Sequence, residues 1–364
     1  MTDMATADPS GQIRSRLAAY ERRFGRLFEE YFRSLSASYD APVFSRFTPE
    51  CLDLLRDLSL RGGKRTRVAF LYEAARLVTP EPVAGLDEAA LSIELLQTHG
   101  LIHDDIIDDS PTRRGGPSTY YAYQARYPDQ PKTALGLAVL AGDLALALCL
   151  RVLLDSQAPL PVRQAMVQTQ LKAASDTFVG QITDIEKDFA PIPGKDILHD
   201  VAEYKSGRYS ALATMQLGLL AAGEDPTRFE KELSRYARLV GIAEQMCNDY
   251  EDLFGNAKSV DEPAGGDIRE GRRNYTVSAL LNTATASERA VVEAALGDPD
   301  CSQDTIRAIR EIALRRGVQQ RLRDEVRHHA ALASAEAATW RPRWRDEAVT
   351  FFQCLPLWSV ERIM

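Results

Sequence analysis

The sequence has no paired cysteines, no apolar leader and almost no alternation of polar and apolar residues at strand spacing. Its five cysteines are odd in number and widely spaced, which favours free thiols in a reducing compartment over a disulfide scaffold or a cysteine zinc site. The polar start, MTDMATADPSGQ, is unlike a signal peptide, so we expect a cytoplasmic protein. The scarcity of strand patterns indicates an essentially all-α fold.

A basic charge balance is also missing, because 52 acidic residues outnumber 44 basic ones. We therefore expect no nucleic-acid partner, and basic clusters should act locally. The most apolar stretch, 134–154, contains Asp143 and Arg151, so we expect a core helix there and no stable membrane span. We expect residues 1–11 to be disordered and residues 12–364 to form one large helical bundle. Apolar periodicity predicts its helices, among them 13–36, 68–78, 119–126, 134–154, 161–178 and 197–222.

Residues 94–115, ELLQTHGLIHDDIIDDSPTRRG, predict a helix that ends in carboxylates and is followed by two arginines. Asp87 is the expected cap at the start of this helix. Asp104, Asp105 and Asp108 are three and four residues apart, so they share one helix face. Like charges at the negative end of the helix dipole need a positive partner, and oxygen ligands favour a hard cation such as Mg²⁺. The alternative is a solvated acidic helix end.

Two further segments bear on the substrate. Residues 61–67, RGGKRTR, allow Lys64 and Arg67 to converge on one anion around two glycines, although an ordinary basic loop fits equally well. A helix with start signals near residue 226 reaches the segment QMCNDYED, where three side chains with oxygen ligands share a face: Asn248, Asp249 and Asp252. Two acidic helix ends and several basic clusters point to Mg²⁺ ions bridging to a pyrophosphate, and hence to an organic diphosphate substrate.

With these motifs the chain resembles the trans-isoprenyl diphosphate synthases, or polyprenyl synthetases, over residues 47–276. GGKRTR is similar to the family's entry motif, and residues 94–115 are similar to its first aspartate-rich motif with the arginine pair. The segment GQITD at 180–184, Lys205-Ser206 and Gly266-Asp267 follow in the family's order. The resemblance implies an all-α isoprenoid synthase fold with the active-site cavity between the helices that carry the two aspartate-rich motifs. It also implies a homodimer and three Mg²⁺ ions per active site.

The implied activity is a Mg²⁺-dependent condensation of isopentenyl diphosphate with an allylic diphosphate, giving a short-chain all-trans prenyl diphosphate. By resemblance, the metal ligands are Asp104, Asp105, Asp108, Asn248, Asp249 and Asp252. The allylic substrate or its diphosphate contacts Arg113, Lys205 and Gln245. Isopentenyl diphosphate is held by Lys64, Arg67, Gln97 and Arg114. The residues implied to carry catalysis are Asp104, Asp105, Lys205 and Gln245.

The chain departs from the family pattern at the second motif and in the loop that follows it. Asn248 stands where aspartate is usual, and Glu244 replaces a phenylalanine. Asp-Glu-Pro at 261–263 occupies the loop where a lysine normally holds the leaving diphosphate, which leaves Lys258 and Arg272 as candidates for that role.

Two alternative functions stay open: a class I terpene cyclase and a non-catalytic regulatory subunit of a prenyl synthase. A cyclase does not use isopentenyl diphosphate, so GGKRTR and Arg113-Arg114 argue against it. The intact first motif argues against a non-catalytic subunit.

Product length should depend on the helix face that precedes Asp104. One helical turn rises about 5.4 Å, close to the reach of one isoprene unit. In the family, bulky aromatics at the positions of His99 and Gly100 are associated with a C15 product. Here a histidine and a glycine stand there, and Leu96 lies one turn further back, so we expect a C20 product ahead of C15. We expect His99 and His103 to pack or to line the pocket rather than act as acid or base.

Overall fold

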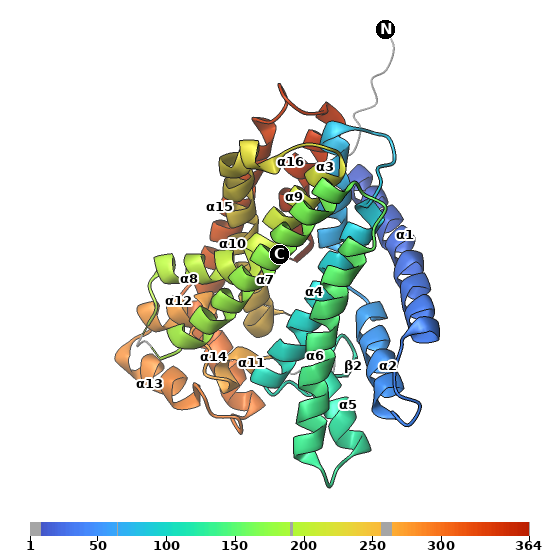
Figure 1. Ribbon diagram of the computed structural model, residues 1–364. Coiled ribbons are helices and arrows are strands. Elements are labelled where there is room, and N and C mark those ends of the chain that lie inside the picture. Colours follow the sequence, from blue (N-terminus) through green and yellow to red (C-terminus); the bar gives the residue numbers. More distant parts are fainter. Residues whose placement is uncertain (1–8, 64, 190–191, 256–263, 364) are drawn as a thin grey trace. The chain divides into compact units, whose positions relative to one another are not determined.

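The computed structural model describes residues 9–63, 65–189, 192–255 and 264–363 (Figure 1). Almost all of the regular structure in these ranges is helical, which confirms the all-α prediction. The chain divides into two compact units: Met1–Lys172 with Thr214–Pro226, and Ala173–Ala213 with Thr227–Met364. Helix α1 already includes residues 9–11, and residues 1–8 lie outside the described residues. That residues 12–364 form one domain stays a prediction.

The first unit is built around helix α4, whose residues are mostly buried between its first turn and Asp105. Helix α6 lies alongside α4, and α3 packs against both α4 and α9 (Figure 1). Its elements are α1 (Pro9–Ser38), α2 (Phe47–Leu60), α3 (Thr66–Val78), α4 (Leu86–Ile107), β1 (Thr112–Arg113), β2 (Gly116–Pro117), α5 (Thr119–Arg126), α6 (Pro131–Leu154), the beginning of α7 (Leu160–Lys187), and α9 (Thr214–Ala221).

Helix α6 has two different faces. Small residues on its buried face allow close packing, namely Ala134, Ala138, Ala141, Gly142 and Ala145. The other face exposes large apolar side chains, namely Leu135, Val139, Leu140 and Leu154. Among the described helices, α6 alone is long and apolar enough to cross a membrane, yet 44% of its most apolar window is buried inside the structure. The expectation of a core helix therefore holds for one face only.

The second unit has its core between α10, α12, α14 and α15. In α14, Ile306, Ile309 and Ile312 recur every third residue and are all buried, which is the pattern of an amphipathic helix on a core. The elements of this unit are the rest of α7, α8 (Lys195–Ala202), the π-helix η1 (Glu203–Ala213), most of the 3₁₀ turn η2 (Pro226–Phe229), α10 (Glu230–Phe254), α11 (Gly266–Arg269), α12 (Tyr275–Thr283), α13 (Ala286–Ala295), α14 (Gln303–Arg315), α15 (Val318–Ala338) and α16 (Asp346–Ile363).

Several predicted helix limits were wrong. Gly85, with φ +82°, occupies the cap position of α4, and Asp87 instead accepts hydrogen bonds from Tyr72 and Arg23, each at 2.7 Å. The helix predicted to end at residue 178 continues to Lys187, so the segment GQITD is helical. The single helix predicted for 197–222 is three segments, because the wider turns of η1 separate α8 from α9.

Candidate active site

The carboxyl end of α4 brings the predicted aspartates together. Asp104 and Asp105 lie in its last turn and Asp108 is its C-cap residue. Arg113 supplies the positive partner that the charge pattern requires. Its Nε donates to Asp105 Oδ1 at 2.7 Å, and its Nη2 forms an ion pair with the same oxygen and lies 3.8 Å from Asp104 Oδ2.

Of the three aspartates at the end of α4, Asp105 is the most buried. The residue has 0% relative exposure, and this burial raises its pKa from 3.8 to about 6, although the neighbouring Arg113 favours the charged form. Its second oxygen, Oδ2, is buried and has no hydrogen-bond partner among the described residues. A buried carboxylate oxygen without a partner is energetically costly, and a bound cation would remove that cost. Asp105 and its neighbours therefore fit a divalent metal ion.

A tight hairpin holds the two arginines beside these aspartates. Strands β1 and β2 pair antiparallel, and Arg114 and Gly115 form the two-residue turn with φ values of +53° and +75°. Positive φ at both positions is the type I′ geometry that suits a hairpin. Arg61 lies across the hairpin, and its Nη1 donates to the carbonyls of Arg113 at 3.0 Å and Pro117 at 2.7 Å. No pattern in the sequence indicated this role of Arg61.

A cluster of guanidinium groups surrounds the loop before α3. The guanidinium of Arg114 lies so close to Gly63 that a Cβ there would be 3.2 Å from Arg114 Cζ. Burial lowers the pKa of Arg114, Glu94 opposes this, and the charges of Arg65, Arg67 and Arg113 lower it further. Such crowding of positive charge around one carboxylate is suited to binding an anion. The predicted anion ligand Lys64 lies outside the described residues.

One member of this cluster has a structural role. Arg65 adopts φ +47°, forms an ion pair with the buried Glu94 and donates to the Ser59 carbonyl at 2.6 Å. Its side chain is thereby fixed between α2 and α4, so it supports the first turn of α3, which carries Arg67.

The predicted product-length residues lie on α4 ahead of the aspartates. Leu96 and Gln97 are buried. His99 is also buried, which lowers its pKa, and its Nδ1 lies 2.9 Å from the Gly142 carbonyl of α6. A Cβ added at Gly100 would meet no atom within 4 Å. The geometry agrees with a packing role for His99 and with space beside Gly100.

In the second unit, two of the three predicted metal ligands are tied to backbone amides. Asp249 is buried and accepts from Gln245 Nε2 at 2.8 Å and from the Tyr275 amide at 2.9 Å. Asp252 accepts from the amides of Gly266 at 3.0 Å and Asp267 at 3.3 Å. Burial raises the pKa of both carboxyl groups.

Asn248 differs from these two aspartates because its side chain is exposed. Of the three predicted metal ligands in this motif, the one that departs from the family pattern is therefore the one open to solvent. The carboxylates of Asp252 and Asp249 also accept hydrogen bonds from the first backbone amides of α11 and α12, respectively, a role that the sequence did not reveal.

Lys205, on the π-helix η1, belongs to an ion-pair cluster at the end of α7. Asp184 lies 2.7 Å from Lys205 Nζ, 3.0 Å from Lys187 Nζ and 3.7 Å from Arg272 Nη1. Although burial favours the neutral acid, the two lysines outweigh it, and the pKa of Asp184 is lowered. Gly180 allows the contact between α7 and η1, because a Cβ there would be 2.3 Å from the Lys205 amide nitrogen.

The structure thus collects three cations, Lys187, Lys205 and Arg272, around Asp184. Arg272 was one of two candidates for the missing loop lysine, and the other, Lys258, lies outside the described residues. Lys187 was not predicted, although its spacing of three residues from Asp184 on one helix was a usable signal.

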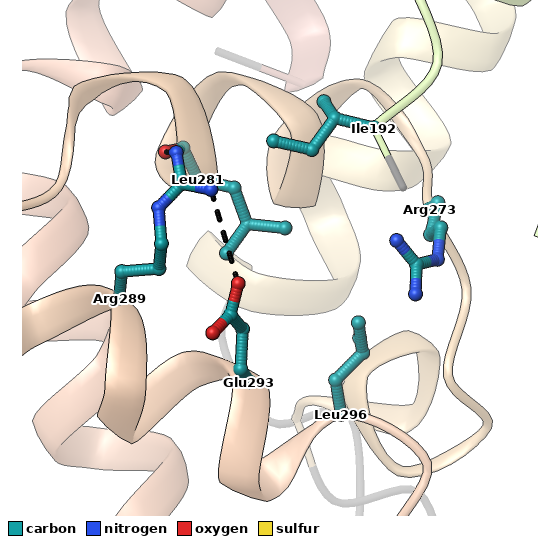
Figure 2. Close-up of a pocket in the computed structure, with 6 residues that line it drawn as sticks. All are labelled: Ile192, Arg273, Leu281, Arg289, Glu293 and Leu296. Carbon is teal, nitrogen blue, oxygen red and sulfur yellow. Dashed lines mark hydrogen bonds and ion pairs between the residues drawn. The ribbon is translucent and has the colours of Figure 1, made fainter. Parts of the chain in front are cut away.

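Two cavities in the second unit have different linings. One, of about 400 Å³, is lined by Ile192, Arg273, Leu281, Arg289, Glu293 and Leu296, and Arg289 lies 3.8 Å from Glu293 (Figure 2). It contains none of the predicted site residues. The other is lined by Asp249, Asp252 and Asp267 and leaves no room for a water molecule, so these aspartates are tightly packed in the described structure.

Together these features define a class of protein. The first unit of this all-α chain places aspartates at a helix end beside two arginines. The second unit has another helix with acidic residues near its end and a cluster of cations around Asp184. These are the side chains of a metal-dependent enzyme that handles diphosphates.

Comparison with known proteins identifies the family. The polyprenyl synthetase family profile matches residues 48–313. A short chain isoprenyl diphosphate synthase of Methanocaldococcus jannaschii is 28% identical over 71% of this chain and 74% of its own. A farnesyl diphosphate synthase of Geobacillus stearothermophilus is 30% identical over 63% and 74%. The chain belongs to the polyprenyl synthetase family and is a prenyl diphosphate synthase, a prenyltransferase of isoprenoid biosynthesis.

A solved structure agrees with this placement. The geranylgeranyl pyrophosphate synthase of Corynebacterium glutamicum, complexed with isoprenyl diphosphate and magnesium, superimposes with a TM-score of 0.85. It is 25% identical, and the match covers 94% of this chain and 98% of that one. The fold prediction is therefore confirmed.

Proposed function

We propose that this protein condenses isopentenyl diphosphate with an allylic diphosphate and releases a C20 all-trans prenyl diphosphate, with C15 as the next expected product. The observation that carries the proposal is the end of α4, where Asp105 is paired with Arg113 through one oxygen, while its other oxygen is buried and has no hydrogen-bond partner in the part of the chain that the structure describes. A divalent cation and a diphosphate would satisfy both groups.

The first unit would bind metal and diphosphate through neighbouring side chains. We propose Mg²⁺ as the cofactor, three ions per active site, with Asp104, Asp105 and Asp108 as ligands in this unit. When bound, Mg²⁺ supplies Lewis-acid stabilisation of the negative charge that develops on the leaving diphosphate. Arg113 stays in reach of the same diphosphate because Arg61 fixes its backbone. Arg113 thus adds positive charge where the transition state becomes more negative.

Isopentenyl diphosphate would bind at the guanidinium cluster. Arg67 and Arg114 can hold its diphosphate by charge-assisted hydrogen bonds, with Lys64 and Gln97 as further proposed contacts. Burial, together with the charges of Arg65, Arg67 and Arg113, lowers the pKa of Arg114 and so disfavours its charged form without an anion, which supports the assignment.

In the second unit, we propose that Lys205 and Gln245 contact the allylic substrate or its diphosphate. Lys205 is held by Asp184 at 2.7 Å, so its ammonium group has a defined position. The proposed metal ligands here are Asn248, Asp249 and Asp252. Asn248 would contribute a neutral oxygen in place of a carboxylate, so we expect weaker metal binding than with aspartate.

A C20 product is supported by the side chains of α4. Gly100 has no side chain, and a Cβ added there would meet no neighbouring atom within 4 Å, so the growing prenyl chain can extend past it. Leu96 and Ile93, buried further back along the helix, would end the pocket within about another turn of 5.4 Å.

We further propose a homodimer. The exposed apolar face of α6, with Leu135, Val139 and Leu140, supports it, because a folded protein seldom leaves such a patch in water. Leu140→Asp should shift the mass measured by light scattering toward the monomer. Leu314→Asp, at an exposed leucine of α14, is the matched control and should leave the measured mass unchanged.

The two diphosphate sites can be separated kinetically. Arg114→Gln should raise the KM for isopentenyl diphosphate by about tenfold or more, equivalent to about 1.5–3 kcal/mol for a lost charge-assisted contact, and change the KM for the allylic substrate much less. Arg126→Gln, at an exposed arginine of α5, is the control and should change neither. Equal increases for both substrates in Arg114→Gln would contradict the assignment.

A further inference from the structure

We propose that His99, His103 and Asp143 form a binding site for a borderline divalent cation such as Zn²⁺ or Co²⁺, separate from the aspartates that would hold Mg²⁺. One nitrogen of each imidazole and one oxygen of the carboxylate lie within 4.8 Å of one another. The histidines are four residues apart on α4 and share a face, and Asp143 approaches from α6, which packs alongside. This inference does not depend on the proposed function.

The two imidazole rings lie close to each other, and one of them lies close to the carboxylate. Their ring centroids are 4.5 Å apart, and His103 Nε2 lies 3.5 Å from Asp143 Oδ1. His99 is oriented by the Gly142 carbonyl, 2.9 Å from its Nδ1. A neutral imidazole that donates through Nδ1 keeps its lone pair on Nε2. A hydrogen bond of this kind, from one ring nitrogen to a carbonyl, orients the imidazole ligands of metal sites.

Gly142 has a second part in this arrangement. A Cβ at this position would lie 2.2 Å from Cδ2 and Nε2 of His103, so any side chain there would displace the ring. The same residue therefore orients one histidine through its carbonyl and makes room for the other by lacking a side chain. Both effects bring the imidazoles to the side of α6 from which Asp143 projects.

The chemistry of the ligands sets the choice of ion. Two imidazoles and one carboxylate suit Zn²⁺, Co²⁺ or Ni²⁺, whereas Mg²⁺ prefers oxygen ligands. Three protein ligands leave a position for water, as in open zinc sites. In the single chain the side chains of His103 and Asp143 are 32% and 57% exposed, so the chain itself does not enclose the site. A bound ion would link α4 to α6 directly beside Asp104.

The test is a titration of the full-length protein with Co²⁺, followed by its visible absorption, in saturating Mg²⁺ so that the aspartates are occupied. We expect one Co²⁺ per chain at this site. Asp143→Asn and His103→Gln should each weaken binding at least tenfold, and Gly142→Ala should weaken it because the His103 ring is displaced. Asp143 is exposed, so its variant should fold normally, which circular dichroism checks.

Two control variants distinguish this site from other side chains that could bind Co²⁺. Asp104→Asn should bind Co²⁺ as the wild type does, because Asp104 belongs to the aspartate cluster. His328→Gln should also bind normally, because His328 belongs to a separate histidine group with His199 and His329. The proposal is overturned if Asp143→Asn and His103→Gln retain wild-type binding, or if either control variant loses it. Synthase activity is not the readout, so failure of the proposed function would leave this result intact.

Discussion

Replacing Asp105 by asparagine should stabilise the metal-free protein and at the same time abolish most of its activity. Asp105 is fully buried, and its pKa is raised from 3.8 to about 6 even with Arg113 beside it. Raising the pKa from 3.8 to about 6 corresponds to about 3 kcal/mol of free energy that disfavours the charged form in the folded state. Asparagine keeps the shape and an oxygen that can accept from Arg113 Nε, but it carries no charge.

The pH dependence follows from the sign of the shift. The folded-state pKa is above the unfolded value, so between pH 3.8 and about 6 the folded protein binds more protons than the unfolded chain. Wild-type stability should therefore fall as the pH rises through this window. In Asp105→Asn this loss of stability is absent. The free energy of unfolding of the variant therefore exceeds the wild-type value most above about pH 6, and the difference disappears toward pH 3.8.

Two assays on the same protein samples check this reasoning. Denaturant unfolding in chelator, repeated across the pH range, should give the variant a higher free energy of unfolding at neutral pH, by up to about 3 kcal/mol. Turnover in saturating Mg²⁺ should fall a hundredfold or more, equivalent to about 3 kcal/mol of lost transition-state stabilisation. A variant that is less stable at neutral pH, or one with near-normal turnover, would refute the account of Asp105.

Three further predictions follow from the rest of the site. Asn248→Asp should lower the Mg²⁺ concentration for half-maximal rate, and a metal titration with an unchanged or higher midpoint would reject this. Gly100→Phe should shorten the main product by one isoprene unit and Leu96→Ala should lengthen it, as chromatographic sizing will show; no change in either would place the pocket floor elsewhere. Arg61→Ala should free the hairpin backbone at Arg113 and raise the KM for the allylic diphosphate, with partial rescue by added guanidinium; a loss that guanidinium does not restore would contradict the positioning role.

The sequence predicted those features that depend on local pattern. The period of apolar residues located most helices. The spacing of Asp104, Asp105 and Asp108 predicted three carboxylates at one helix end, and the structure has Asp104 and Asp105 in the last turn of α4 and Asp108 at its C-cap. The family resemblance added the roles of Lys205 and of the arginine pair, and these side chains lie among other charged groups in their respective units.

Features that depend on tertiary contact were not predictable from the sequence. Arg61 was one arginine in a basic loop, and only the hairpin's position shows that it binds the Arg113 and Pro117 carbonyls. Asp249 was interpreted as a metal ligand, but the sequence cannot show that the Tyr275 amide, 26 residues later, donates to it. Likewise, nothing in the local pattern distinguishes the exposed Asn248 from its buried neighbour.

The central claim is tested most directly by one incubation. Purified protein, Mg²⁺ and labelled isopentenyl diphosphate are mixed with each allylic diphosphate in turn, and the products are sized, with Asp104→Ala as the inactive control. The account predicts Mg²⁺-dependent incorporation of label, mainly into a C20 product. Consumption of the allylic diphosphate without isopentenyl diphosphate would indicate a cyclase instead, and the absence of any incorporation would indicate a non-catalytic subunit.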